Sequence, residues 1–157
     1  MATGDAVLLG HGFYYDELPA GFRFRTMGRT ITETDLVTFI NLIWFTEEVF
    51  VNTHDTAGRA LAGRVVPGAL VYAFAEGLLT PSMQFTGLAF LGAELDVKAP
   101  TVVGDTIHVE GEVIESRPAS SGHRGLVRTR NSVVNQRGET VLVYTPLRLV
   151  KGRPGPG

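Results

Sequence analysis

The segment that most constrains the fold is "GALVYAFAEGLLT", residues 68–80, which is apolar almost all the way around a helical projection. A helix with this pattern is buried on every side rather than lying on a surface. Pro67 suits the start of such a helix, and Thr80-Pro81 predicts its end, because the residue before a proline disfavours helical geometry. One fully buried helix needs other elements to surround it.

The chain after this helix supplies strands. In "DTIHVEGEVIESR", Ile107, Val109 and Val113 alternate with polar residues, which is typical of a strand with one buried face. "GLVRTRNSVVNQ" and "ETVLVYTPLRLV" are joined by "NQRG", a hairpin turn that puts Gly138 where a positive φ is needed. Early helices followed by late, closely spaced strands predict an α+β fold, a long antiparallel sheet wrapped around one buried helix.

Two further helices are expected before the buried one. Thr32 as N-cap, Asp35 at the third helical position and apolar residues at helical spacing predict a helix over 33–44. Thr46 is the expected N-cap of a second, short helix, with the two following glutamates in its first turn.

Length and composition bound the organisation of the chain. Its 157 residues are about one domain's worth, and no repeat or linker divides them. We expect a single domain over 1–157, with a core of about 12–150 and a flexible Gly/Pro-rich tail at 151–157. No apolar run reaches the ~18 residues of a membrane span, and no basic segment precedes the N-terminal apolar run, so a cytoplasmic location is expected.

Several classes of function are disfavoured by the residues present. A net charge of −2 gives no reason to expect nucleic acid as a partner. The absence of cysteine excludes disulfides and thiolate chemistry. The four histidines are scattered without ligand spacing, so we expect no metal site. We also expect no bound cofactor.

Four segments occur in an order and spacing that resemble one family: "GRTITETDLVTF", "GRVVPGALVYAFAEGLL", "VVGDTIHVEGEVIESR" and "NQRGETVLVYTPLRLV". Over about residues 12–150 the chain resembles the MaoC-like dehydratases, hotdog-fold proteins that include (R)-specific enoyl-CoA hydratases. The resemblance implies the hotdog fold, a homodimer or higher homo-oligomer, and a hydro-lyase reaction of fatty acid metabolism. It also implies an acyl thioester, usually acyl-CoA, as ligand, with coenzyme A present only as part of the substrate.

The same resemblance puts the catalytic pair of the family in doubt. The catalytic loop of the family reads roughly G-D-x-N-P-L-H, and its Asp and His activate the water that adds across the α,β double bond. In the ungapped register Phe45 stands at the Asp and Phe50 at the His. General acid–base groups are worth ~10²–10⁴-fold each, and a phenyl ring transfers no proton. The family mechanism is therefore not expected to run unchanged.

Three residues remain as catalytic candidates. Gly68 matches the family glycine whose backbone N–H polarises the thioester carbonyl, a role that suits a helix N-terminus. Glu76 stands where many family members have serine, and a carboxylate in so apolar a helix is costly unless it is paired, protonated or open to a cavity. Glu47, in the former catalytic loop, is the third candidate. For Glu76 the competing interpretations are that it emerges at an edge of the fold or that it pairs with an arginine. For Glu47 the competing interpretation is a plain helix-start position.

The sequence leaves the function open between classes. In one hypothesis the chain is a hydro-lyase whose acid–base work has moved to Glu76 or Glu47, with Gly68 as oxyanion donor. In another it is a non-catalytic acyl-binding subunit of a heteromeric dehydratase, whose partner supplies Asp and His. Acyl-CoA thioester hydrolysis is a third option, because one fold supports many chemistries. Four aromatic residues are candidates for an acyl tunnel or for plain core: Tyr72, Phe74, Phe85 and Phe90.

Overall fold

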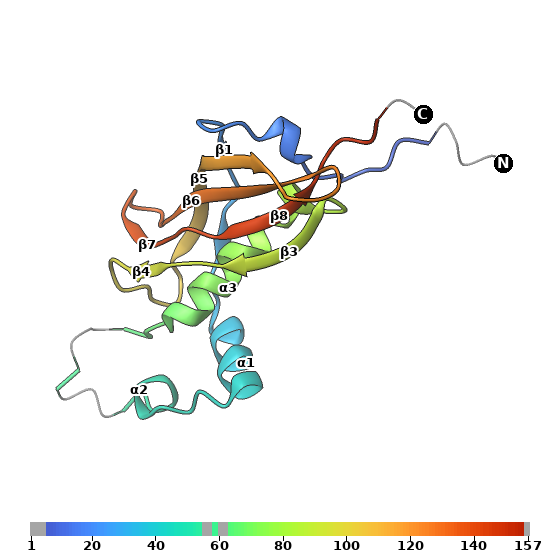
Figure 1. The fold of residues 1–157 in the computed structure, drawn as a ribbon. Helices are drawn as coiled ribbons and strands as arrows, with labels where there is room; N and C mark the ends of the chain where they lie inside the picture. The colour runs from blue at the N-terminus through green and yellow to red at the C-terminus, as the bar shows by residue number, and fades with distance from the viewer. Residues whose placement is uncertain (1–5, 55–57, 60–62, 156–157) are drawn as a thin grey trace.

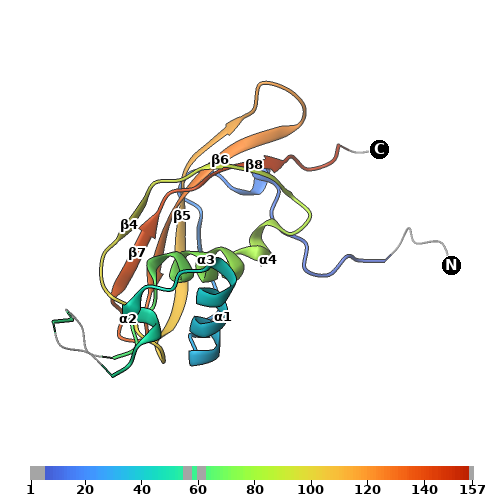
Figure 2. The ribbon, with the colours of Figure 1, turned by 90° about the horizontal axis from the view of Figure 1, so that it is seen from below.

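A curved antiparallel sheet wraps around one helix, α3 (Gly68–Leu78), in the computed structural model, which describes residues 6–54, 58–59 and 63–155 (Figure 1). The other helices are α1 (Glu33–Ile43), α2 (Glu48–Val51) and α4 (Thr80–Met83), with a 3-10 turn over Tyr15–Glu17. The view from below shows the sheet curving over α3, with α1 and α2 on the open side (Figure 2). This arrangement confirms the α+β architecture.

The strands are β1 (Arg23–Arg25), β2 (Arg29–Thr30), β3 (Gly87–Gly92), β4 (Leu95–Val97), β5 (Thr106–Pro118), β6 (Arg124–Val134), β7 (Thr140–Tyr144) and β8 (Leu147–Lys151). Their order is β1-β5-β6-β7-β4, with β2 also on β5, and all pairings are antiparallel. β6 pairs with β7 in one half and with β8 in the other, and β4 and β3 follow on the far side. The outermost row, β3 and β4, is therefore a sheet edge.

The core lies between the concave face of the sheet and α3. Leu70, Val71 and Ala75 of α3 are buried against alternate residues of β5, such as Ile107 and Val109. The alternation predicted for β5 is confirmed, and Gly138 in the β6–β7 turn has the expected positive φ of 77°.

The helix α3 is not buried on every side, so this part of the expectation is wrong. Ala69, Ala73 and Gly77 lie four residues apart and are exposed. Helical residues at this spacing share one face. The sheet covers the opposite side of the helix, and small side chains leave this face open. The helix also does not simply stop before Pro81, because α4 follows at once and holds Pro81 in its first turn, where a missing N–H costs little.

The helix α1 begins as the sequence predicts. Asp35 N–H donates to Thr32 Oγ1 at 3.1 Å, and Thr32 N–H donates to Asp35 Oδ2 at 2.9 Å, which forms a reciprocal capping box. The backbone N–H of Thr32 also holds the pKa of Asp35 below its ordinary value. The cap is exposed, and it fixes where the chain leaves β2.

The predicted N-cap of the second helix is wrong. The helix α2 starts at Glu48, and Glu47, not Thr46, occupies the cap position without a side-chain hydrogen bond. Trp44 ends α1 in a left-handed conformation with φ of 60°, and the N–H of Phe45 still bonds to Ile40. This turn sends residues 45–47 along a non-helical path, so that the next helix begins two residues after Thr46.

Candidate functional site

The two residues at the family's catalytic positions form an aromatic pair. Phe45 and Phe50 have ring centroids 5.1 Å apart, tilted by 43°. Phe50 is buried, and Phe45 packs against the same hydrophobic core. Offset aromatic pairs at this distance are favourable, and their ring atoms offer no group that exchanges protons. In this structure the pair holds the α1–α2 connection against the core.

A salt bridge fixes the same connection from the other side. Arg64 Nη1 donates to the carbonyl of Phe50, and its Nε donates to Glu33 Oε1 at 2.9 Å. One guanidinium therefore joins α1, α2 and the segment that leads into α3. Glu47 lies at the exposed start of α2. Among the described residues it makes one hydrogen bond, in which its backbone carbonyl accepts from the N–H of Phe50. The role of Glu47 in catalysis stays a prediction.

Gly68 is the first residue of α3, with Pro67 as its cap. The N–H groups of Leu70 and Val71 both donate to the carbonyl of Pro67, at 3.0 and 3.2 Å. No described residue accepts a hydrogen bond from the N–H of Gly68, as is usual at the start of a helix. A side chain at this position would meet Val97, because a Cβ there would lie 3.1 Å from Cγ2 of that residue.

A small cavity of about 40 Å³ lies beside the start of α3. Its lining includes Val66, Gly68, Val71, Val97, Thr101 and Leu142. The position suits the oxyanion role that the resemblance implies for Gly68, since a helix N-terminus favours developing negative charge. That role stays a prediction.

Glu76 is held by two donors. Arg148 Nη2 donates to Glu76 Oε1 at 2.5 Å, and the Tyr144 hydroxyl donates to the same oxygen at 2.8 Å. Tyr144 has no exposed surface, and both burial and the charge of Glu76 raise the pKa of its hydroxyl far above its ordinary value. The competing interpretation, in which Glu76 pairs with an arginine, is what the structure shows. Whether the carboxylate also has a catalytic role stays a prediction.

The geometry of α3 separates Glu76 from Gly68. Eight residues of helix rise by about 12 Å at 1.5 Å per residue. The carbon atoms that exchange protons in enoyl hydration are within two bonds of the thioester carbonyl. A carbonyl bound to the N–H of Gly68 would therefore place those atoms far from the Glu76 carboxylate, which Arg148 and Tyr144 hold in place.

An apolar groove of about 420 Å³ opens beside the other end of α3. The residues that line this outer groove include Phe13, Phe24, Met27, Leu78, Leu79 and Pro81. An inner cavity of about 40 Å³ adjoins the groove and shares four of its lining residues, Phe13, Phe24, Leu79 and Ser82. The inner cavity also reaches Thr129 and Arg148. Grooves of this size and character accept small ligands.

The four aromatic tunnel candidates do not line this groove. Tyr72 and Phe74 are partly buried against the core, as the alternative held. Phe85 and Phe90 are about half exposed, at 49% and 48%. The aromatic residues that do line the groove are Phe13 and Phe24, from the N-terminal segment and β1. The sequence analysis did not identify them as candidates.

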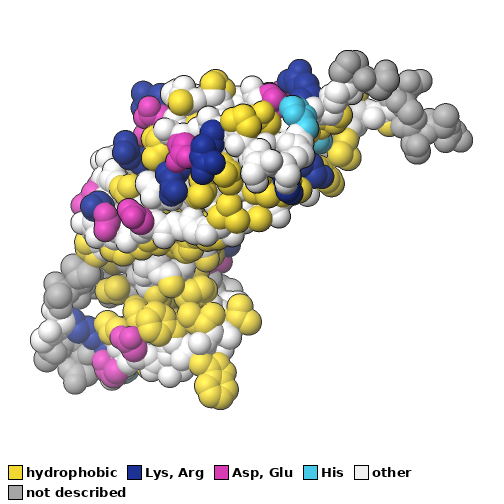
Figure 3. Space-filling model, in the orientation of Figure 1, with side chains coloured by type: hydrophobic (Ala, Val, Ile, Leu, Met, Phe, Trp, Pro, Cys, Tyr) yellow, Lys and Arg dark blue, Asp and Glu magenta, His cyan; other side chains and the backbone are white. Residues whose placement is uncertain are grey.

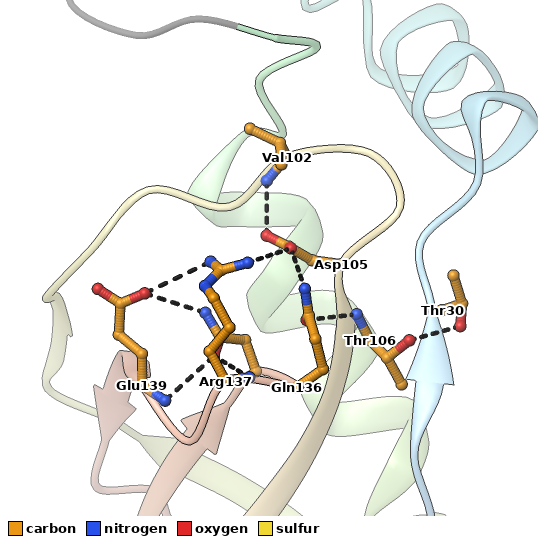
Figure 4. Close-up of polar contacts among 8 residues, drawn as sticks. Thr30, Val102, Asp105, Thr106, Gln136, Arg137 and Glu139 are labelled. Carbon is orange, nitrogen blue, oxygen red and sulfur yellow. Dashed lines mark hydrogen bonds and ion pairs between the residues drawn. The ribbon is translucent and has the colours of Figure 1, made fainter.

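A polar network at the opposite end of the sheet is structural. The buried Asp105 accepts from Val102 N–H at 3.0 Å, Gln136 Nε2 at 2.7 Å and Arg137 Nη1 at 3.2 Å (Figure 4). Burial alone would raise the pKa of Asp105, but these hydrogen bonds, led by that from Gln136, outweigh it and hold the pKa below its ordinary value. The network ties the loop before β5 to the β6–β7 turn.

The described part of the chain holds neither a candidate metal site nor a candidate membrane-spanning helix. Within residues 6–54, 58–59 and 63–155, no three His, Asp or Glu side chains are grouped so that they could hold a metal ion. No helix in the same part of the chain is long and apolar enough to span a membrane.

Residues 19–143 match the family described as FAS1-like, dehydratase domain region. The match covers most of the chain, which therefore belongs to this family and is a MaoC-like hotdog protein. An (R)-specific enoyl-CoA hydratase from Rhodospirillum rubrum is 25% identical over 107 residues, 68% of this chain and 71% of the relative. Mesaconyl-CoA hydratase from Cereibacter sphaeroides is 31% identical over 106 residues, 66% of this chain but only 31% of that longer protein.

Solved structures confirm the hotdog fold. The MaoC-like dehydratase from Rhodospirillum rubrum is 28% identical with a TM-score of 0.79, covering 92% of this chain and 100% of that one. More distant structures show the fold alone. A double hotdog protein of Mycobacterium tuberculosis is 21% identical with a TM-score of 0.78, covering 96% of this chain and 48% of that one. The HadBC 3R-hydroxyacyl-ACP dehydratase complex of the same organism is 16% identical with a TM-score of 0.70, covering 83% and 96%.

Proposed function

We propose that this chain is an acyl-thioester-binding member of the hydratase family, and that a second hotdog unit supplies the acid–base pair for hydration. The single observation that carries the proposal is the packing of Phe45 against Phe50 at the two catalytic positions that the family resemblance implies. Restoring a proton-transfer pair there would require removing two rings from the core. The hydrogen bonds of Glu76 also support the proposal. Arg148 and Tyr144 hold its carboxylate, so it does not stand in for the missing acid–base pair.

The outer groove supports the binding part of the proposal. Its walls are mostly apolar, which suits the methylene groups of an acyl chain. The two curated relatives are hydratases of CoA thioesters by name. We therefore assign an acyl-CoA, or another acyl thioester, as the ligand class, with the acyl group in the outer groove.

The exposed sheet edge supports the second part of the proposal, that another hotdog unit binds this chain. β3 and β4 carry five exposed large hydrophobic side chains: Leu88, Phe90, Leu91, Leu95 and Val97. Hydrophobic side chains are visible over this edge in Figure 3. An open edge of this kind pairs with another strand unless it is protected. A second hotdog unit is the occupant we propose. Only a separate catalytic subunit, as in a heteromeric complex, would bring the acid–base pair, because a copy of this chain has the same Phe45 and Phe50.

Calorimetric titration with butyryl-CoA and free coenzyme A tests the binding part directly. We expect butyryl-CoA to bind and free coenzyme A to bind more weakly, because only the thioester fills the outer groove. Leu78→Trp, at a partly buried position that lines the groove, should remove the difference between the two ligands. Phe85→Trp is the matched control, since Phe85 is half exposed and outside the groove. Equal binding of both ligands to the unmodified chain would contradict the acyl-binding proposal.

A further inference from the structure

Arg148 stands out among the residues around the inner cavity because the cavity is otherwise nearly apolar. Besides Arg148, the polar lining residues are Ser82 and Thr129. The Arg148 side chain is 16% exposed, and none of its nitrogen atoms is both fully buried and without a hydrogen-bond partner, so its free donors still reach water. Within the described part of the chain, Glu76 is the one carboxylate that pairs with Arg148, and it engages a single nitrogen, Nη2.

A guanidinium has five N–H donors, so most of those on Arg148 remain free to bind another acceptor. Buried donors without an acceptor are unfavourable. A purely apolar chain end in the inner cavity would keep water from these donors and offer no acceptor in its place. An oxygen atom in the same place would accept a hydrogen bond from Arg148.

The charge of the pair decides which oxygen fits. Glu76 neutralises Arg148, and the hydroxyl of Tyr144 keeps the carboxylate in position. A second carboxylate would meet the negative charge of Glu76 in a poorly hydrated site, where like charges repel strongly. A neutral hydroxyl meets no such repulsion and still accepts from the guanidinium.

The size of the inner cavity limits what can reach Arg148. About 40 Å³ has room for a small end group and not for a long chain. The outer groove, about 420 Å³, would hold the preceding methylene groups. Because the two spaces share Phe13, Phe24 and Leu79, a short acyl chain that enters along the groove would point its far end at Arg148.

We infer that the Arg148–Glu76 pair selects short acyl thioesters whose far end carries a hydroxyl group. This inference rests on the proposed function, because it assigns the specificity of the same groove. It concerns recognition only, and no bond is made or broken at Arg148. Glu76 acts here as a positioning residue that holds Arg148 and cancels its charge.

The test compares two CoA thioesters of equal chain length, 4-hydroxybutyryl-CoA and pentanoyl-CoA, by calorimetric titration. The hydroxyl of the first stands where the second has a methyl group. We expect 4-hydroxybutyryl-CoA to bind about tenfold more tightly, which corresponds to one net hydrogen bond to a charged donor. Succinyl-CoA, with a carboxylate at the far end, should bind more weakly than 4-hydroxybutyryl-CoA.

The second part of the test replaces Arg148 and Glu76 by neutral residues. Arg148→Met combined with Glu76→Gln removes both charges together, so that neither is left unpaired. This double variant should prefer pentanoyl-CoA. Arg117→Met is the control, since Arg117 is exposed and pairs with Glu115 away from the groove, and it should keep the original preference. Melting curves establish that each variant is folded.

The possible outcomes separate the inference from the proposed function. If pentanoyl-CoA binds the unmodified chain as tightly as 4-hydroxybutyryl-CoA, the inference is wrong although acyl binding stands. An unchanged preference in the folded double variant would likewise overturn it, as would tightest binding of succinyl-CoA. If no CoA thioester binds at all, the proposed function fails and the inference fails with it.

Discussion

The Tyr144 hydroxyl donates a 2.8 Å hydrogen bond to Glu76 Oε1 and so links the end of β7 to α3 across 68 residues of sequence. The same carboxylate oxygen accepts from Arg148 on β8. Tyr144 is fully buried, and its ring packs edge-on against Tyr72 at 5.0 Å. A charge in the middle of an apolar helix is thereby tolerated, because two donors from the sheet satisfy it.

Removing the Tyr144 hydroxyl should lower the stability of the fold without changing the structure. We expect Tyr144→Phe to lower the free energy of unfolding by about 2 kcal/mol, since a buried hydrogen bond to a charged group is lost. Urea unfolding at neutral pH measures the change. Tyr72→Phe is the matched control, because the described residues give its hydroxyl no hydrogen bond, and it should cost much less. Equal losses in the two variants would show that the bond to Glu76 contributes nothing.

The two threonines near the helix starts are expected to differ in their contribution to the free energy of unfolding. Thr32→Ala should lower the free energy of unfolding by about 1 kcal/mol, because Thr32 Oγ1 caps α1. Thr46→Ala should change it little, since α2 begins at Glu48 and Thr46 caps nothing. Thermal or urea unfolding of the pair distinguishes them. A larger loss for Thr46 would mean that the start of α2 is misplaced.

Asp105 makes part of the stability depend on pH. Its pKa in the folded chain lies below the ordinary value of 3.8, so its stabilising effect is complete above that value and disappears as pH falls through the folded pKa. Asp105→Asn should therefore cost about 2 kcal/mol at neutral pH and make acid unfolding less steep. Urea unfolding from pH 7 to pH 3 measures both.

An exposed aspartate gives the comparison. Asp96 has 74% of its side chain exposed, and within the described part of the chain its ion-pair partner is Lys98, at 3.2 Å. Asp96→Asn should leave both the stability and its dependence on pH almost unchanged, because exposed ion pairs contribute little. If the Asp105 variant lost no more stability at pH 7 than at pH 3, the assigned direction of the pKa shift would be wrong.

The open sheet edge predicts assembly. Light scattering at micromolar concentration should give at least twice the 16.9 kDa of one chain if two copies pair through β3 and β4. Leu91→Asp, on β3, should reduce this mass, because it buries a charge in the expected interface. Ile114→Asp on β5 is the control and should leave the mass unchanged. A chain that stays monomeric with every candidate hotdog partner would contradict the proposal that the β3–β4 edge is an interface.

The sequence predicted the architecture because each element has a strong local signal. Thr32 and Asp35 form their cap within four residues of chain, and β5 shows its buried face through simple alternation. The start of α2 was placed wrongly because Trp44 ends α1 in a left-handed conformation that residues with a side chain rarely adopt. Neighbouring residues alone could not reveal that turn.

The candidate site was harder to predict, because its partners come from distant strands. Glu76 was singled out from its apolar surroundings, but the sequence could not say which arginine would meet it. A signal did exist: Leu142, Tyr144, Arg148 and Val150 have the same parity along β7 and β8, so Arg148 falls on the buried face. A charge at a buried strand position requires a partner, and Glu76 supplies it.

The measurement that tests the central claim most directly is hydration of crotonyl-CoA by the purified chain alone. Loss of the absorbance of the conjugated enoyl thioester follows the reaction, and titration in parallel shows that the ligand is bound. We predict binding without turnover, because Phe45 and Phe50 pack where the acid–base pair would stand. Turnover near the enzyme median of about 10 s⁻¹ would contradict the account. It would mean that this chain carries out hydration with groups of its own.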